Sequence, residues 1–164
     1  MGPDPRRVGG LWVLVSFGLA MMLTILPWPQ GLAFLNPDWM ALALLFWAFV
    51  APERVGIVTA WAVGLLADAL TGRLLGQHAI AYGVMMYLAL RFRDPFLGWA
   101  FLLQGVWILV LLLTGQLLVL WTQHQELAEP FQYRYWWPSL SGTIVWVLIG
   151  LLAHVRRQGQ IQGG

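Results

Sequence analysis

The chain has 164 residues, of which 60% are hydrophobic and only 10% are charged. Soluble domains carry about 25% charged residues, so this composition excludes an ordinary soluble domain and predicts a membrane protein. The absence of cysteine excludes disulfides, thiolate metal sites and cysteine nucleophiles. A net charge of +2 without a cluster of basic residues predicts no nucleic-acid partner.

Six apolar segments, separated by breaks rich in proline and glycine, predict six transmembrane helices in one all-α integral-membrane domain, 1–164. A basic leader precedes the first segment, as in a signal peptide. No convincing Ala-x-Ala cleavage site follows it, which favours a retained first span. The chain is too short for a second domain beside several spans. The segments cover about residues 9–27, 39–51, 55–70, 77–90, 96–121 and 136–155.

Arginine is distributed unequally between the two sides of the membrane that the six predicted spans define. With the N-terminus in the cytoplasm, only Arg73 and Arg134 fall outside, so the positive-inside rule predicts cytoplasmic N- and C-termini. Tryptophans near the predicted span ends agree, because indole rings favour the headgroup layer. The arginines on the cytoplasmic side are Arg6, Arg7, Arg54, Arg91, Arg93, Arg156 and Arg157.

The second, third and fourth segments offer only 13 to 16 residues each, whereas a perpendicular span needs about 20. They either extend past their apolar parts or lie inside the bundle, where lipid does not set their length. The second and third could instead form a re-entrant hairpin. That arrangement would place Glu53 and Arg54 within the membrane, which is costly even for a pair, so six spans are favoured.

Asp68 is the only acidic residue well inside an apolar segment. Exposure of this carboxylate to lipid would cost on the order of 2–3 kcal/mol, so a buried partner is expected. Arg73, His78 and the free N–H groups of a helix beginning around Gly76 are the nearby candidates. The carboxylate could act as a base, proton carrier or ligand anchor. The favoured interpretation is a brace for the tight outer turn between the third and fourth spans.

Small residues surround this acid at intervals of four: Gly64, Asp68, Gly72 and Gly76. On one helix this spacing would align them on a face that permits close backbone approach. The Thr71–Gly72 pair more readily ends a helix, because glycine accepts a positive φ. We therefore expect close packing around a turn rather than a phosphate loop.

Enzymatic signatures are missing from the sequence. An aspartyl membrane peptidase needs two facing carboxylates, and neither His-Glu-x-x-His nor Gly-x-Ser-x-Gly occurs. The predicted topology separates His154 from His78 and His124, which excludes a zinc site built from the three. The sequence thus predicts a protein that is not an enzyme and has no cofactor or metal.

Aromatic residues gather between the last two spans, in a polar loop that also carries Glu126 and Glu129. They could form an interfacial belt that anchors the sixth span, or a surface on which a partner docks. Small residues at the outer end of the sixth span favour contact with another helix, of this chain or of a partner. The candidate partner contacts are Phe131, Tyr133, Tyr135, Trp136, Trp137, Ser139 and Gly142.

The stretch GLLADALTGRLLGQHAIAYGVMMYLALRFR resembles the signature region of the bacterial rod shape-determining protein MreD family, approximately G-x-x-x-D-x-x-x-G-x-x-x-G-x-x-A-[LI] before a span with a basic end. The C-terminal WWPSLSGTIVWVLIGLLAHVRRQ also resembles the last span and basic tail of the family. Length, number of spans and orientation match as well. The motif positions are Gly64, Asp68, Gly72, Gly76, Ala79 and Ile80, and Arg91 and Arg93 supply the basic end.

The resemblance implies a multi-pass scaffold of the bacterial cytoplasmic (inner) membrane that maintains cell shape without catalysis. Such proteins belong to the elongasome, which directs side-wall peptidoglycan synthesis. They pair with the single-span protein MreC and act with the MreB filament, the RodA glycosyltransferase and a class B penicillin-binding transpeptidase, among membrane lipids.

The resemblance also implies a fold similar to the six-helix substrate-binding component of energy-coupling-factor transporters. This similarity raises the alternative that the protein binds a small ligand or lipid between its helices. Polar groups within the spans are few and scattered over the sequence, which favours a lipid-like ligand over a polar one in this alternative.

Overall fold

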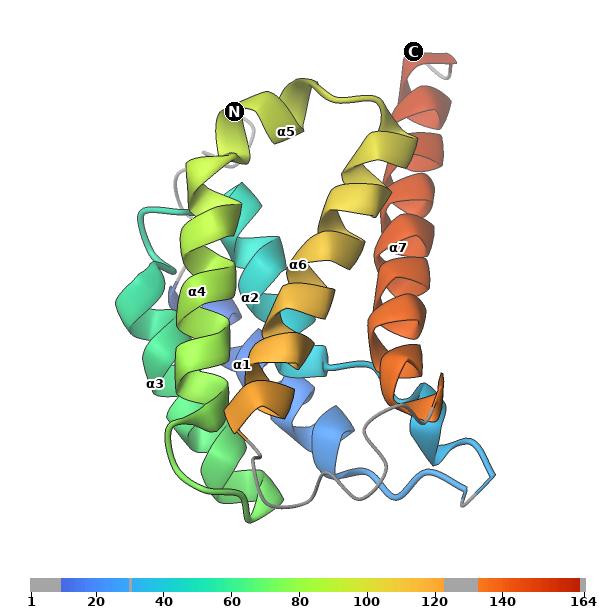
Figure 1. The fold of residues 1–164 in the computed structure, drawn as a ribbon. Helices are drawn as coiled ribbons and strands as arrows, with labels where there is room; N and C mark the ends of the chain where they lie inside the picture. The colour runs from blue at the N-terminus through green and yellow to red at the C-terminus, as the bar shows by residue number, and fades with distance from the viewer. Residues whose placement is uncertain (1–9, 30, 123–132, 163–164) are drawn as a thin grey trace.

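The computed structural model describes residues 10–29, 31–122 and 133–162, with side chains described up to residue 151 except at 133 and 134. These residues contain helices and no strand, so the all-α prediction is confirmed. The elements are α1 (Gly10–Ile25), η2 (Ala33–Leu35), α2 (Trp39–Val50), α3 (Ile57–Thr71), α4 (Gln77–Arg91), α5 (Arg93–Gly98), α6 (Phe101–Thr122), η3 (Tyr133–Trp136) and α7 (Trp137–Gln162) (Figure 1).

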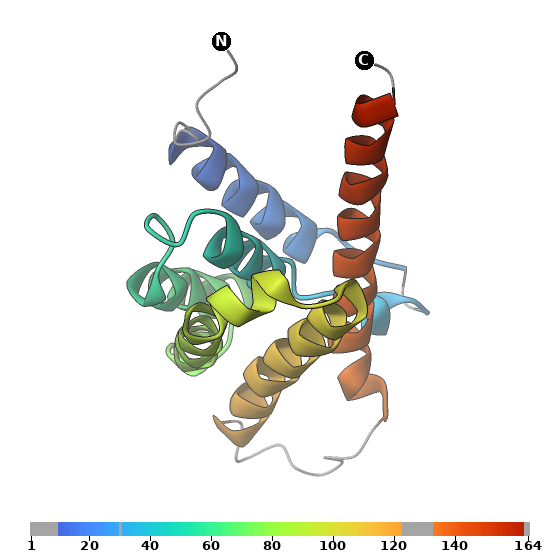
Figure 2. The ribbon, with the colours of Figure 1, turned by 90° about the horizontal axis from the view of Figure 1, so that it is seen from above.

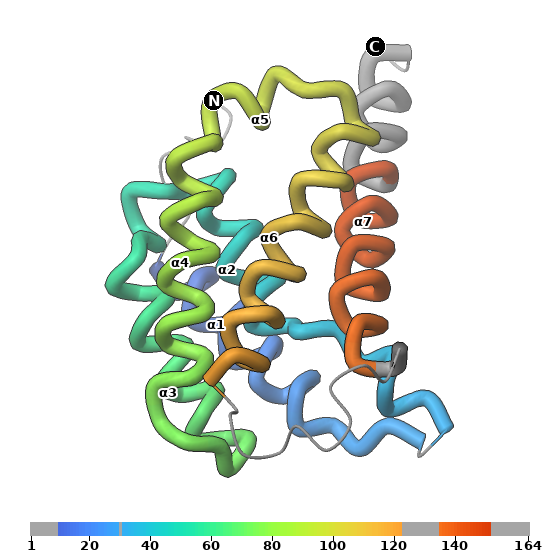
Figure 3. Tube along the Cα trace, viewed as in Figure 1, coloured from blue at the N-terminus to red at the C-terminus, as the bar shows by residue number. Residues whose placement is uncertain are grey.

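The helices form an elongated bundle in which successive long helices alternate in direction (Figure 3). The turn between α3 and α4 lies at the same end as the C-terminal end of α6 and the start of α7, while α5 crosses the opposite end (Figure 1). We call these the α3–α4 end and the α5 end. α3 packs mainly on α4, α4 on α6, and α6 on α7, which stands at the edge of the bundle (Figure 2).

The core lies along α2, α4 and α6. Fully buried side chains on these helices include Leu44 and Leu45, Met85 and Met86, and Ile108 and Leu111. The outward faces are apolar as well: Trp12 on α1 is 66% exposed and Leu102 on α6 is 82% exposed. A helix that is apolar on all sides is typical of a membrane protein, because lipid replaces water as its outer environment.

Helix length divides the elements into two groups. The stretches Ala33–Val50 and Phe101–Thr122 are long and apolar enough to cross a membrane, whereas Gly10–Ile25, Ile57–Thr71 and Trp137–Leu151 are shorter apolar helices. At 1.5 Å per residue, a helix of 15 residues such as α3 or α4 is about 22 Å long, against about 30 Å of hydrocarbon.

The segment expected at 96–121 is divided in the structure. Residues 93–98 form the separate helix α5, and α6 begins only at Phe101. The break is stabilised from α6, because Gln104 Nε2 donates to the carbonyls of Phe96 and Trp99 at 3.2 and 3.1 Å. The apolar composition of residues 96–100 did not reveal this break.

Candidate functional site

Gly72 ends α3 in a left-handed conformation, with φ +66°. The N–H groups of Gly72 and Arg73 both donate to the Asp68 carbonyl, the latter at 3.0 Å. This geometry satisfies a carbonyl that the helix end would otherwise leave free. A residue with a Cβ is strained at this φ, whereas glycine is not.

The Asp68 side chain crosses from the end of α3 to the start of α4. Its Oδ2 accepts from the Gly76 N–H at 2.7 Å, and its Oδ1 accepts from the His78 N–H at 3.0 Å and from His78 Nδ1 at 2.7 Å. A carboxylate only accepts hydrogen bonds, so a bond from His78 to ionised Asp68 requires the ring tautomer that carries its proton on Nδ1. Asp68 is fully buried, and its charge lies where the α4 dipole is positive.

Gly64 brings α3 and α4 into backbone contact one turn further from the loop. A Cβ at Gly64 would lie 2.4 Å from Ala79 Cα and 2.5 Å from Ala79 N. Gly76, which precedes α4, has φ +106°. The structure therefore brings together Gly64, Asp68, Gly76, His78 and Ala79 in one contact between α3 and α4.

Arg73 is placed differently from the expectation that it could be a partner of Asp68. Only its backbone N–H bonds to Asp68, and among the described residues no hydrogen bond or ion pair involves its guanidinium group. The partner that the fold selects for the carboxylate is His78.

A second polar contact, which the sequence analysis missed, joins α2 to α4. Asp38 caps α2 by accepting from the Ala41 N–H at 2.9 Å, and the Tyr82 hydroxyl lies 2.7 Å from both carboxylate oxygens. Asp38 stands directly before an apolar segment, which is a signal for a helix N-cap. No local pattern indicated Tyr82, which is 44 residues away.

A third polar contact joins α6 to the start of α7. Gln116 Nε2 donates to the Tyr135 carbonyl, Ser139 Oγ donates to Gln116 Oε1, and the Tyr135 hydroxyl donates to the Gln116 carbonyl at 3.2 Å. Burial raises the pKa of Tyr135 above its ordinary value, and the positive charge of Arg73 opposes this shift.

The candidate partner contacts do not share one environment. Ser139 is buried against α6, and a Cβ at Gly142 would lie 3.0 Å from Leu112 Cδ1, so both face the interior of this chain. Trp137 is 37% exposed and packs edge-on against Phe34, with ring centroids 5.9 Å apart. Trp136 is partly buried and touches Tyr135. Phe131 and the Tyr133 side chain lie outside the described residues.

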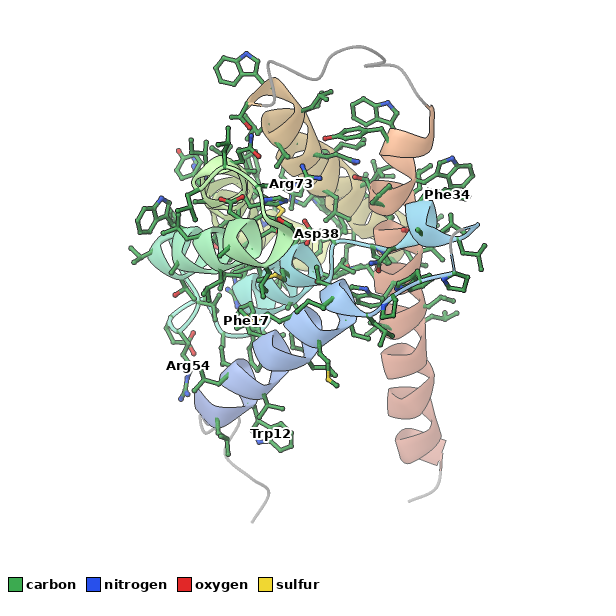
Figure 4. All side chains as sticks on the ribbon, turned by 90° about the horizontal axis from the view of Figure 1, so that it is seen from below. Trp12, Phe17, Phe34, Asp38, Arg54 and Arg73 are labelled. Atoms are coloured by element: carbon green, nitrogen blue, oxygen red, sulfur yellow. The ribbon has the colours of Figure 1, made fainter. Side chains whose placement is uncertain are left out.

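The three polar contacts surround a cavity of about 390 Å³ at the α3–α4 end. Asp38, Arg73, His78, Tyr82 and Gln116 all line it. Figure 4 shows Asp38 and Arg73 near the middle of the bundle when this end faces the viewer. The polar groups that are scattered along the sequence thus converge in space.

Gly72 provides a test of the turn geometry. We expect Gly72→Ala to lower the free energy of unfolding by about 1–2 kcal/mol, because an L-residue is strained in the left-handed region. Gly72→Asn should cost less, since asparagine tolerates this conformation. The measurement is unfolding in detergent, followed by circular dichroism. Gly83→Ala is the matched control, because Gly83 lies within α4 with nothing within 4 Å of its added Cβ. Equal effects at positions 72 and 83 would contradict the argument.

Among the described residues, no group of three His, Cys, Asp or Glu side chains could hold a metal ion. Apolar outer faces, long apolar helices and a buried acid at a helix–helix turn together define a membrane-associated helical bundle.

Comparison with known proteins identifies the family. Residues 5–156 match the family described as rod shape-determining protein MreD, so the chain belongs to the MreD family. A curated relative, the rod shape-determining protein MreD of Haemophilus influenzae, is 37% identical over 76 residues, which are 46% of this chain and 47% of the relative. The match thus spans about half the length of that relative. No solved structure matches the chain.

Proposed function

We propose that this protein is a non-catalytic scaffold of the bacterial cytoplasmic membrane that binds MreC and helps to organise side-wall peptidoglycan synthesis. In the same complex it acts with the MreB filament, the RodA glycosyltransferase and a class B penicillin-binding transpeptidase. The observation that carries this proposal is the match to the MreD family over residues 5–156.

The proposed topology has six spans and cytoplasmic termini, in an arrangement similar to the substrate-binding component of energy-coupling-factor transporters. The alternating directions of the long helices support it, as does the position of α5 across one end (Figure 3). Arg91 and Arg93 belong to that α5 end, and Arg73 belongs to the α3–α4 end. By the positive-inside rule, this distribution of arginines supports a cytoplasmic α5 end.

Single-cysteine labelling tests this topology on a cysteine-free background. Leu74, at the α3–α4 turn, is 75% exposed, and the Asp94 side chain is 94% exposed on α5. We expect Leu74→Cys to react with an impermeant maleimide in intact cells, and Asp94→Cys to react only after permeabilisation. Glu53→Cys should behave like Asp94→Cys, because it follows α2 at the α5 end. Labelling of Leu74→Cys and Asp94→Cys from one side would overturn the orientation, and an unreactive Glu53→Cys would favour the re-entrant hairpin.

In this proposal, Asp68 and its donors brace the outer half of the bundle. The carboxylate satisfies backbone donors of Gly76 and His78 across the turn, which fixes the start of α4 relative to the end of α3. α4 in turn packs on α6 and α2. A fixed α3–α4 turn therefore holds the surface at this end in one shape.

Trp137 is the exposed aromatic residue that we propose as a partner contact at the α3–α4 end. Tryptophan is enriched among residues that dominate binding energy, and this side chain is already positioned by Phe34. The opposing interpretation is an aromatic belt, in which Trp137 only meets lipid headgroups.

Co-purification with MreC separates these interpretations. We expect the wild-type chain to capture co-expressed MreC from a detergent extract, and Trp137→Ala to reduce the yield about tenfold, as loss of a hot-spot residue does. Trp12→Ala is the matched control, because Trp12 is a 66% exposed tryptophan on α1. Failure of the wild-type chain to capture MreC would refute the scaffold proposal. Equal yields from the two variants would assign Trp137 to the belt.

A further inference from the structure

The proposed scaffold function does not use the cavity at the α3–α4 end. Its volume of about 390 Å³ falls within the about 300–1,000 Å³ that is usual for small-molecule sites. Met40, Met85, Leu112 and Val119, from α2, α4 and α6, supply apolar walls. An apolar chamber with a few converging polar groups is the usual form of a ligand site.

Two side chains of opposite formal charge line this cavity, Asp38 and Arg73. Among the described residues they form no ion pair with each other. The Arg73 guanidinium has five N–H donors and forms no hydrogen bond with another described residue. Asp38 accepts from Ala41 N–H and the Tyr82 hydroxyl, which leaves acceptor capacity on its two oxygens.

The neighbouring polar groups are already engaged within the chain. Asp68 is fully buried and bonded to Gly76 and His78, and Gln116 is bonded to Tyr135 and Ser139. Of these residues, His78, Gln116, Tyr135 and Ser139 line the cavity and give it a fixed polar wall. Among the residues that line the cavity, the formally charged side chains are therefore one cation, Arg73, and one anion, Asp38, and both keep free hydrogen-bonding capacity.

We propose that this cavity binds a zwitterionic group, with its ammonium at Asp38 and its phosphate or carboxylate at Arg73. A purely anionic ligand would meet the Asp38 carboxylate, and a purely cationic ligand would meet the Arg73 guanidinium. Like charges in such a site disfavour the wrong ligand, so only a ligand with both charges gains from both residues. The apolar walls suit the hydrocarbon next to such a head group in a lipid, while a free zwitterion would use the polar groups alone.

Native mass spectrometry of the purified chain in detergent tests the proposal. The probes are phosphatidylethanolamine, phosphatidylglycerol with the same acyl chains, and glycerophosphoethanolamine, which is the zwitterionic head group without chains. We expect phosphatidylethanolamine to bind about tenfold more tightly than phosphatidylglycerol. Its ammonium can pair with Asp38, and phosphatidylglycerol has no such group.

Two variants remove one charge each. Arg73→Gln and Asp38→Asn should each weaken phosphatidylethanolamine binding about tenfold. Asparagine is also a good N-cap, so Asp38→Asn keeps the start of α2. The matched controls are Arg91→Gln and Asp94→Asn at the α5 end, which should bind as the wild type does. Lipid that associates non-specifically with the outer surface is unaffected by any of the four substitutions.

The outcomes separate the sources of the ligand. Binding of the lipid but not of glycerophosphoethanolamine supports a membrane lipid as the occupant, and equal binding of both supports a soluble zwitterion. Equal affinity for the two lipids, or loss of binding in Arg73→Gln but not in Asp38→Asn, would overturn the proposal. So would failure of both lipids and of the free head group to bind. None of these results depends on MreC, so the scaffold proposal stands or fails separately.

Discussion

Asp68→Ala is expected to lower the free energy of unfolding by about 3–5 kcal/mol, because each buried donor that loses its acceptor costs about 1–3 kcal/mol. The substitution leaves three donors without their acceptor, namely the Gly76 N–H, the His78 N–H and His78 Nδ1. Two of these are backbone groups at the start of α4, which cannot move to other partners without changing the turn. The measurement is equilibrium unfolding in detergent, together with capture of MreC.

Three further variants separate the contributions to this effect. His78→Ala keeps both backbone bonds, so its effect should be limited to about 1–3 kcal/mol. Arg73→Ala should cost less than Asp68→Ala, because the Arg73 guanidinium is not bonded to the carboxylate in the described chain. Asp94→Ala removes an exposed acid at the α5 end and should leave stability unchanged. Wild-type stability and MreC capture in both Asp68→Ala and Arg73→Ala would refute the brace.

Gly64→Ala is the second substitution with a large expected effect. The added Cβ would lie 2.4 Å from Ala79 Cα, so α3 and α4 would have to separate. Overpacking of this kind costs about 1–3 kcal/mol, and Gly64→Val should cost more than Gly64→Ala because it adds further volume. Thermal unfolding in detergent, followed by circular dichroism, measures both.

The atoms in this contact are backbone atoms of Ala79 and His78, which suggests a decisive control. Adding Ala79→Gly to Gly64→Ala should not restore stability, because it removes only the Ala79 Cβ and leaves Cα and N in place. Gly18→Ala, which meets nothing within 4 Å on α1, should be close to neutral. Rescue by Ala79→Gly would show that side-chain volume, rather than backbone approach, sets the packing of α3 on α4.

Much of the architecture could be predicted from local patterns. Apolar runs of helical length and their proline- and glycine-rich breaks located the helices, because the physical signal, hydropathy over a window, is contained in the run itself. Hydropathy did not predict the break between α5 and α6 at residues 96–100. That break depends on Gln104, which bonds to the carbonyls of Phe96 and Trp99. Composition alone cannot reveal a break that a polar side chain stabilises.

For the site, the sequence by itself determined that Asp68 needs a buried partner and that the glycines around it suit a turn with close packing. Those inferences follow from the cost of an unpaired charge in lipid and from the steric freedom of glycine. Only the tertiary structure decided that His78 rather than Arg73 supplies the partner, and that Asp38 and Tyr82 meet across 44 residues. Contacts between distant residues depend on how whole helices pack, and no local spacing in the chain encodes that arrangement.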